Sequence, residues 1–270
     1  MASEAIYTNK IFLCGAHPLL KTIVADIPSL HEKFKKVHCV YQVSCLDPDA
    51  PEGKYATHFV VNGDEWLVHA DKVAKRVGKQ KYVELEFKSV DALNSFFKGK
   101  ITPATLPKMK GVNFIREFGV FMMALLKMAD LLGLEAPPAD EDTKRLLVKC
   151  YFYLLSVGIS TLNKQGHEAI HAWALKSPDR VYAWKVDGED SVSAYIRVKA
   201  GKTKAGKGEY KRAMPFFTMK FNNLDSALGI LMSIDDMLDS VKEGKLIMEG
   251  APEFGAQIGE YMLQVGAYAK

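Results

Sequence analysis

The 270-residue sequence has few cysteines, and their spacing fits neither a metal site nor a redox motif. The four are Cys14, Cys39, Cys45 and Cys150, and no two show the C-x-x-C spacing of zinc ribbons or thioredoxin-like sites. A chain of this length can bury enough apolar surface to fold without disulfides. We therefore expect four reduced thiols in a cytoplasmic protein.

Long apolar runs and the common cofactor or hydrolase loops are also missing. The longest apolar stretches, residues 120–126 and 151–159, fall short of the roughly 20 residues that span a bilayer. Residues 11–20 are interrupted by Gly15, His17 and Pro18, which argues against a signal peptide. The sequence contains no Walker loop, no G-x-G-x-x-G and no G-x-S-x-G. We expect no membrane-spanning helix, no cofactor and no serine hydrolase.

What is present is the composition of a folded globular chain, with 48% hydrophobic residues, 25% charged residues and a net charge of +4. At about 150 residues per domain, this length favours slightly fewer than two domains. Residues 134–145 read LEAPPADEDTKR, and two prolines followed by three acidic residues do not suit a buried element. We place a boundary there, between units 1–135 and 136–270. The alternative is a long surface loop within one domain.

The two halves resemble each other as an internal repeat of about 100 residues. Strand-like runs begin at equivalent places, alternating strands end in Phe before an Asp-led helical pattern, and short strands end in Gly before a helix containing Glu-Phe-Gly. The paired anchors are Val40 and Val181, Phe87 and Phe221, Gly111 and Gly250, and Glu117 and Glu253. Four anchors in the same order indicate duplication with small loop insertions.

Each repeat reads as helix, several antiparallel strands, helix, short strand and helix. Residues 28–37 supply the leading helix of the first repeat, and residues 143–177 supply two helices separated near Asn163 and Gly166. The predicted fold class is therefore α+β, with helices gathered over a mostly antiparallel sheet in each unit.

Residues 216–262 resemble the C-terminal signature of the sterol carrier protein type 2 family. They predict a strand (217–221), an Asp-led helix (224–232), a short amphipathic helix (234–241), a strand ending in Gly (246–250) and a last helix (254–265). The first repeat matches more loosely, since it is shorter between Asp91 and Gly111 and contains Pro103 and Pro107 there. The resemblance implies two tandem units, each with a sheet of about five strands covered by helices around an apolar tunnel. It also implies non-catalytic binding or transport of a fatty acyl chain, a sterol or another lipid.

Methionine supports a ligand site in the second repeat, which holds six of the eleven methionines. Methionine is unbranched and polarizable, so it adapts to variable apolar ligands. Gly229, Gly255 and Gly259 lie in predicted helices. Each glycine there lowers helix stability by about 1 kcal/mol relative to alanine. Close approach of a ligand or backbone explains them, as does helix termination or loose packing. The predicted ligand-binding residues are Phe217, Met219, Leu228, Met232, Met237, Met248, Phe254, Ile258 and Met262.

One alternative is a zinc-dependent hydrolase. His167-Glu168-Ala169-Ile170-His171 matches H-E-x-x-H, in which two histidines on one helical face hold zinc while the glutamate acts as base. Glu189, 18 residues beyond His171, is the candidate third ligand. Against this reading, polar residues precede His167, and Glu189 lies in a predicted turn.

A second alternative is a tandem structural or interaction scaffold whose interiors are filled by side chains. The same second repeat carries one basic cluster with interleaved glycines, which predicts a hairpin. Anionic lipid head groups or a ligand's own anionic group would suit this cluster. Its segment contains a single aromatic residue, Tyr210, and therefore offers little base stacking, which argues against nucleic acid. Its members are Arg197, Lys199, Lys202, Lys204, Lys207, Lys211 and Arg212.

Overall fold

The chain divides into an N-terminal unit, Ser3–Asp130, and a C-terminal unit, Leu131–Tyr268. This division comes from a computed structural model that describes residues 3–75 and 78–270. It falls within helix α5 (Ile115–Leu132), a few residues before the boundary placed at 135/136 from the sequence. The fold class is confirmed: both units are α+β, and each contains a five-stranded, mostly antiparallel sheet.

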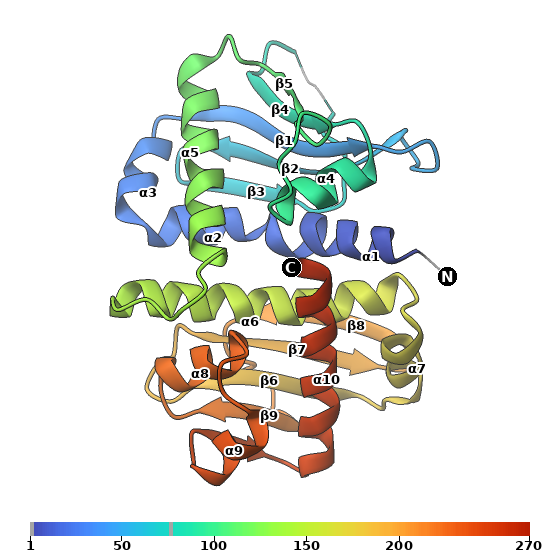
Figure 1. Ribbon diagram of the computed structural model, residues 1–270, viewed down its shortest axis with the longest axis vertical. Coiled ribbons are helices and arrows are strands. Elements are labelled where there is room, and N and C mark those ends of the chain that lie inside the picture. The colour runs from blue at the N-terminus through green and yellow to red at the C-terminus, as the bar shows by residue number, and fades with distance from the viewer. Residues whose placement is uncertain (1–2, 76–77) are drawn as a thin grey trace. The chain divides into compact units, whose positions relative to one another are not determined.

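In the N-terminal unit, the sheet has the strand order β3-β2-β1-β4-β5, and only β1 and β4 run parallel (Figure 1). Helical segments precede the sheet, and two more helices are interleaved with its last strands. The elements in chain order are α1 (Glu4–Lys10), π-helical η1 (Ile11–Ala16), α2 (Leu19–Asp26), α3 (Pro28–Phe34), β1 (His38–Leu46), β2 (Lys54–Asn62), β3 (Glu65–His69), β4 (Tyr82–Phe87), α4 (Val90–Phe97), β5 (Lys108–Lys110) and α5.

The C-terminal unit has the equivalent order β8-β7-β6-β9-β10, again with one parallel pair, β6 and β9. The two helices predicted within residues 143–177 are confirmed as α6 and α7. The elements are α6 (Glu141–Lys164), α7 (Glu168–Lys176), β6 (Arg180–Val186), β7 (Ser193–Lys199), β8 (Lys202–Lys207), β9 (Phe217–Phe221), α8 (Leu224–Leu231), α9 (Met237–Lys242), β10 (Leu246–Glu249) and α10 (Pro252–Ala269).

Two sequence anchors of the repeat have local physical causes. The glycines that end β5 and β10, Gly111 and Gly250, have φ of 77° and 127°, a region that side-chain-bearing residues rarely adopt. A Cβ atom at Gly111 would also overlap the carbonyl oxygen of Tyr82. The same backbone turn therefore requires glycine in both units.

The Asp-led helices also begin alike. The Ser89 side chain accepts a hydrogen bond from the Ala92 amide at the start of α4, and Asn223 accepts one from Ser226 at the start of α8. Asp91 and Asp225 then occupy the first turn, where a carboxylate interacts favourably with the helix dipole.

The N-terminal run that contains Gly15, His17 and Pro18 is helical in the structure. Residues 11–20, interpreted as an interrupted run, are helical through η1 and the start of α2 and are largely buried. Gly15 lies inside the π-helical segment, and Pro18 lies at the N-cap of α2, where its missing N–H costs no helical bond. Gly15 and Pro18 therefore do not end the helical structure of this segment.

Helix α6 is the central helix of the C-terminal unit, and it packs on β7, β8 and α8. It begins at Glu141 after an Asp140 N-cap, so the predicted linker is shorter at its C-terminal end than residues 134–145. Among the described residues, α6 is the one single helix that is long and apolar enough to cross a membrane, and 83% of its apolar window is buried in the structure. That burial is typical of the core helix of a globular unit.

Candidate functional site

The predicted ligand-binding residues come from five consecutive elements of the C-terminal unit, β9 to α10. In Figure 1, α8, α9 and α10 lie on the same face of the β6–β9 sheet region. Five of the nine side chains are buried: Phe217, Met219, Leu228, Ile258 and Met262. The other four are half-buried: Met232, Met237, Met248 and Phe254.

Methionine side chains fill the space beside the glycines of α10. The Met248 sulfur lies 2.5 Å from where a Cβ atom on Gly255 would stand, and the Met237 methyl carbon lies 2.9 Å from the equivalent point on Gly259. The sequence analysis explained these glycines by close approach of a ligand or a backbone, whereas the groups that approach them in the structure are thioether side chains. In the third case, Gly229, the group is the Asp235 carboxylate.

Two polar side chains that the sequence reasoning missed lie among these apolar residues. Tyr182 and Trp184 alternate along β6, so they share a face, and in register they pair with Phe217 and Met219 of β9. The Trp184 indole N–H donates to the sulfur of Met262 at 3.3 Å, a weak acceptor. The Tyr182 hydroxyl has no hydrogen-bond partner among the described residues. The alternating pattern of residues 181–186 could have indicated that Tyr182 and Trp184 share one face of a strand.

The candidate zinc ligands are engaged separately. His167 occupies the N-cap position of α7, and the ring Nδ1 of His171 lies 3.0 Å from the Asn163 side-chain oxygen. The Glu189 carboxylate accepts two hydrogen bonds from the Arg145 guanidinium, at 2.7 and 2.9 Å. Within residues 3–75 and 78–270, no group of three His, Cys, Asp or Glu side chains is placed to hold a metal ion.

The basic cluster forms the predicted hairpin, β7 and β8, but its charges are partly neutralised. Arg197 makes a bidentate pair with Asp179, and Lys199 also approaches that carboxylate at 3.4 Å. Lys207 lies over the Tyr153 ring at 4.7 Å. The exposed remainder of the cluster consists of Lys202, Lys204, Lys211 and Arg212.

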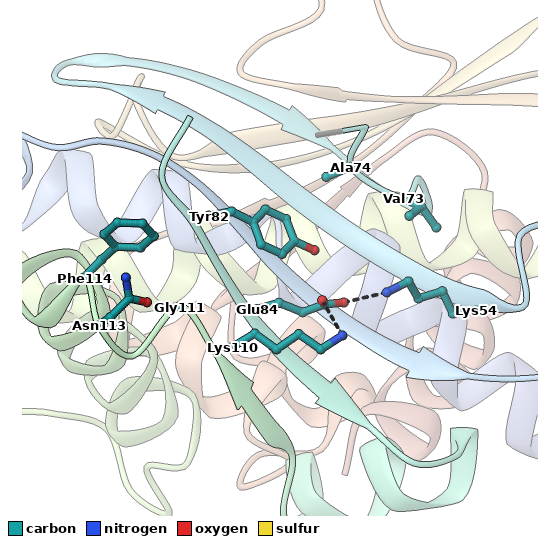
Figure 2. Close-up of a pocket in the computed structure, with 9 residues that line it drawn as sticks. All are labelled: Lys54, Val73, Ala74, Tyr82, Glu84, Lys110, Gly111, Asn113 and Phe114. Carbon is teal, nitrogen blue, oxygen red and sulfur yellow. Dashed lines mark hydrogen bonds and ion pairs between the residues drawn. The ribbon is translucent and has the colours of Figure 1, made fainter. Parts of the chain in front are cut away.

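The N-terminal unit contains a polar cavity of about 430 Å³, which the sequence reasoning did not anticipate (Figure 2). Glu84 of β4 lies in its wall and is 2% exposed. Lysines reach this carboxylate from strands on both sides of β4. The lining residues are Lys54, Val73, Ala74, Tyr82, Glu84, Lys110, Gly111, Asn113 and Phe114.

The Glu84 carboxylate is fully satisfied by donors. One oxygen accepts from Gln42 (2.6 Å), Ser44 (2.6 Å) and Lys54 (2.8 Å), and the other accepts from Lys110 (3.0 Å). Burial alone would raise the pKa of Glu84, but the hydrogen bonds from these four residues outweigh it and lower the pKa to about 2. Glu84 is therefore ionised throughout the physiological range.

The cavity as a whole is balanced in charge. Lys54 and Lys110 also donate to Glu86, at 3.1 and 2.5 Å, so two ammonium groups face two carboxylates. An ammonium group has three N–H bonds, and each lysine uses two of them here. The arrangement links β2, β4 and β5 through their side chains. No signal at sequence level brings Lys54, Glu84 and Lys110 together, because the sheet order does so.

Comparison with known proteins finds similarity at the level of structure. No protein-family model matches the chain, and no curated protein matches it in sequence. Solved structures that it is similar to include a conserved hypothetical protein of Thermus thermophilus, described as possibly a sterol carrier protein, at 17% identity over 43% of this chain and 85% of that chain, with a TM-score of 0.31.

Two further structural neighbours are of different kinds. The ubiquinone synthesis protein UbiJ-SCP2 is 16% identical over 43% of this chain and 96% of that chain, with a TM-score of 0.28. The inverting sec-alkylsulfatase Pisa1 from a Pseudomonas species is 14% identical over 65% of this chain but only 30% of that chain, with a TM-score of 0.25.

Proposed function

We propose that this protein binds and carries a lipid or fatty-acyl-type hydrophobic molecule in the interior of its C-terminal unit, without covalent chemistry. The proposal regards the chain as two tandem sterol carrier-like units, of which the second holds the ligand. The observation that carries it is the pairing of methionine side chains with glycines of α10. This pairing makes part of the interior displaceable.

The interior beside α10 can change its packing because flexible side chains fill it. Met237 and Met248 are half-buried, have three side-chain rotatable bonds each, and fill the gaps beside Gly259 and Gly255. If both side chains rotate outward, the space that they leave beside Gly255 is bordered by the ring of Phe217, within a unit whose buried residues include Leu228 and Ile258. An apolar chain entering there replaces methionine contacts with its own, so the dispersion contacts of the core are retained.

The decisive experiment measures bound lipid directly. The purified protein is analysed by native mass spectrometry, and its affinity for a fluorescent fatty acid is measured. A Gly259→Met variant places a second thioether chain where Met237 now lies, and we expect at least a tenfold loss of affinity. Gly119→Met is the matched control, since Gly119 is exposed on α5 and a Cβ there meets no atom within 4 Å.

The outcomes separate the alternatives. Lipid binding that Gly259→Met weakens and Gly119→Met does not would support the proposal. If no lipid co-purifies and the fluorescent fatty acid does not bind to the unmodified protein, the proposal is wrong, and the scaffold with filled interiors takes its place. About one bound zinc per chain would instead favour the hydrolase with His167, His171 and Glu189.

We also propose a cytoplasmic location and transient contact with membrane surfaces. Cys39, Cys45 and Cys150 are buried thiols and Cys14 is a half-buried one, and no two of the four are joined by a disulfide, which suits a reducing compartment. The exposed basic residues of the β7–β8 region are the proposed contact with anionic head groups. Substituting Lys202 and Lys204 by glutamine should weaken co-sedimentation with anionic vesicles, and unchanged co-sedimentation would contradict the membrane contact.

A further inference from the structure

The hydroxyl group of Tyr182 stands out because it is buried and has no hydrogen-bond partner among the described residues. The side chain is 0% exposed. A buried polar group without a partner loses its hydrogen bonds to water and gains none in return, and native proteins rarely leave one unpaired. An unsatisfied hydroxyl in a tightly packed interior therefore requires a reason.

The surroundings of Tyr182 connect it to the proposed ligand site. Its ring contacts Phe217 and Phe216, with ring centroids 6.3 and 5.8 Å apart, and it pairs in register with Phe217. On the other side lies Trp173 of α7, at 5.5 Å. The Trp173 ring in turn packs against the ring of Tyr261 of α10, with centroids 5.2 Å apart.

The N-terminal unit shows what a satisfied tyrosine looks like at the equivalent strand. Tyr41 lies on β1, the strand that pairs in parallel with β4 as β6 pairs with β9. It is also 0% exposed, but its hydroxyl donates to the Glu117 carbonyl of α5 at 3.1 Å. A tyrosine thus occupies equivalent strands of the two units, and its hydroxyl is hydrogen-bonded in the N-terminal unit but not in the C-terminal unit.

We infer that Tyr182 donates a hydrogen bond to the polar head of the bound ligand, an inference that rests on the proposed function. Trp184, two residues along the same face, offers a second N–H that now meets only the Met262 sulfur. Two donors among apolar side chains select an amphiphile whose head carries an acceptor oxygen, as a carboxylate or an ester carbonyl does. A pure hydrocarbon leaves both donors unsatisfied.

The test compares Tyr182→Phe with Tyr41→Phe against three displacing ligands: dodecanoate, its methyl ester and n-dodecane. We expect Tyr182→Phe to weaken dodecanoate binding at least about tenfold, because the variant loses a hydrogen bond to a charged acceptor in an apolar interior. Binding of n-dodecane should not change, and Tyr41→Phe should leave all three affinities unchanged. A loss for dodecanoate alone identifies a carboxylate head, whereas an equal loss for the methyl ester identifies a carbonyl oxygen.

Stability of the unliganded protein supplies a second readout. Removing an unpaired buried hydroxyl should leave the unfolding midpoint of Tyr182→Phe equal to or above that of the unmodified protein. Tyr41→Phe should lower it, because the Glu117 carbonyl loses its donor. If Tyr182→Phe lowers the midpoint as Tyr41→Phe does, the hydroxyl is satisfied within the fold and the inference is overturned.

The two levels of failure are distinguishable. If the unmodified protein binds none of the ligands, the proposed function fails and the inference fails with it. If it binds dodecanoate and Tyr182→Phe binds it equally well, the lipid-binding function stands and the head-group contact is wrong.

Discussion

The two units have the same strand order and both have apolar cores, but the buried residues on one face of their sheets differ in chemistry. In the N-terminal unit, Gln42 and Glu84 pair across β1 and β4 and anchor a network of buried charges. At the corresponding pair of the C-terminal unit stand Ala183 and Thr218, and its distinctive feature is instead methionine against glycine. The same strand order thus carries a network of buried charges in one unit and methionine side chains against glycines in the other, so the two units are distinguished by their side chains and not by their strand order.

A second difference lies between the Asp-led helix and the last strand. The C-terminal unit has α9 there, capped by Asp236, and α9 brings Met237 to Gly259. The N-terminal unit has no helix between α4 and β5, a stretch that the structure describes in full, where the sequence is shorter and contains Pro103 and Pro107. The apolar site proposed for the second unit therefore has no complete counterpart in the first.

The largest expected difference between the units is a loss of stability at low pH. We expect it in the N-terminal unit, which contains the buried His17. His17 is buried beside the rings of Phe97 and Phe12, at 4.5 and 6.5 Å, and neither ring nitrogen has a partner among the described residues. Burial lowers the pKa of His17 from 6.5 to about 3. The unfolded chain takes up a proton below pH 6.5 and the folded unit does not until about pH 3. The contribution of His17 to the free energy of unfolding is therefore at its maximum above pH 6.5, and it falls by about 5 kcal/mol as the pH drops to 3.

The measurement is urea unfolding at several pH values, with Trp66 as the probe of the N-terminal unit in a Trp173→Phe, Trp184→Phe background. His17→Leu should remove most of the loss between pH 6.5 and 4.5. At pH 7 it should be as stable as the parent or more so, because two unpaired buried nitrogens disappear. An unchanged pH profile in His17→Leu would show that His17 is hydrogen-bonded or reachable by water.

The next effect tests whether the charge network is essential to the N-terminal unit. Glu84→Gln keeps the shape of the side chain but removes the more buried of the two carboxylates that Lys54 and Lys110 share, so we expect a loss of about 3 kcal/mol. Thr218→Val, at the equivalent position of β9, should cost less than about 1 kcal/mol. Equal losses at the two positions would remove the contrast between the units.

The difference in stability between the parent protein and Glu84→Gln should decrease at low pH. Because the folded pKa of Glu84 is about 2 and the ordinary value is 4.5, the carboxylate stabilises the fold above pH 4.5. This stabilisation is lost as the pH falls from 4.5 to 2. The stability gap between the parent and Glu84→Gln should therefore narrow across that window.

Sequence patterns predicted the α+β class, the order of elements in each repeat and the place where the repeats differ, because each depends on local rules. Alternation predicted β4 and β9, and the glycines at 111 and 250 follow from a single backbone turn. The polar cavity was not predictable, since residues 54, 84 and 110 meet only after β2, β4 and β5 are placed in one sheet. The Tyr182 hydroxyl was missed for a similar reason, because a missing partner is a property of packing.

The smallest effect uses the glycine of the Glu-Phe-Gly motif that the two units share in sequence. Gly119 is exposed within α5, and a Cβ atom there meets no atom within 4 Å, so Gly119→Ala should stabilise the N-terminal unit by about 0.5–1 kcal/mol through helix propensity alone. Gly255 is buried in α10, and a Cβ there would lie 2.5 Å from the Met248 sulfur and 3.0 Å from the Phe217 ring. The Met248 chain can swing aside, but Phe217 is fully buried, so Gly255→Ala should destabilise the C-terminal unit despite the same gain in propensity. Chemical denaturation of both variants measures the two changes in the free energy of unfolding, which we expect to have opposite signs. Stabilisation by Gly255→Ala would mean that the interior beside α10 already has space for a methyl group.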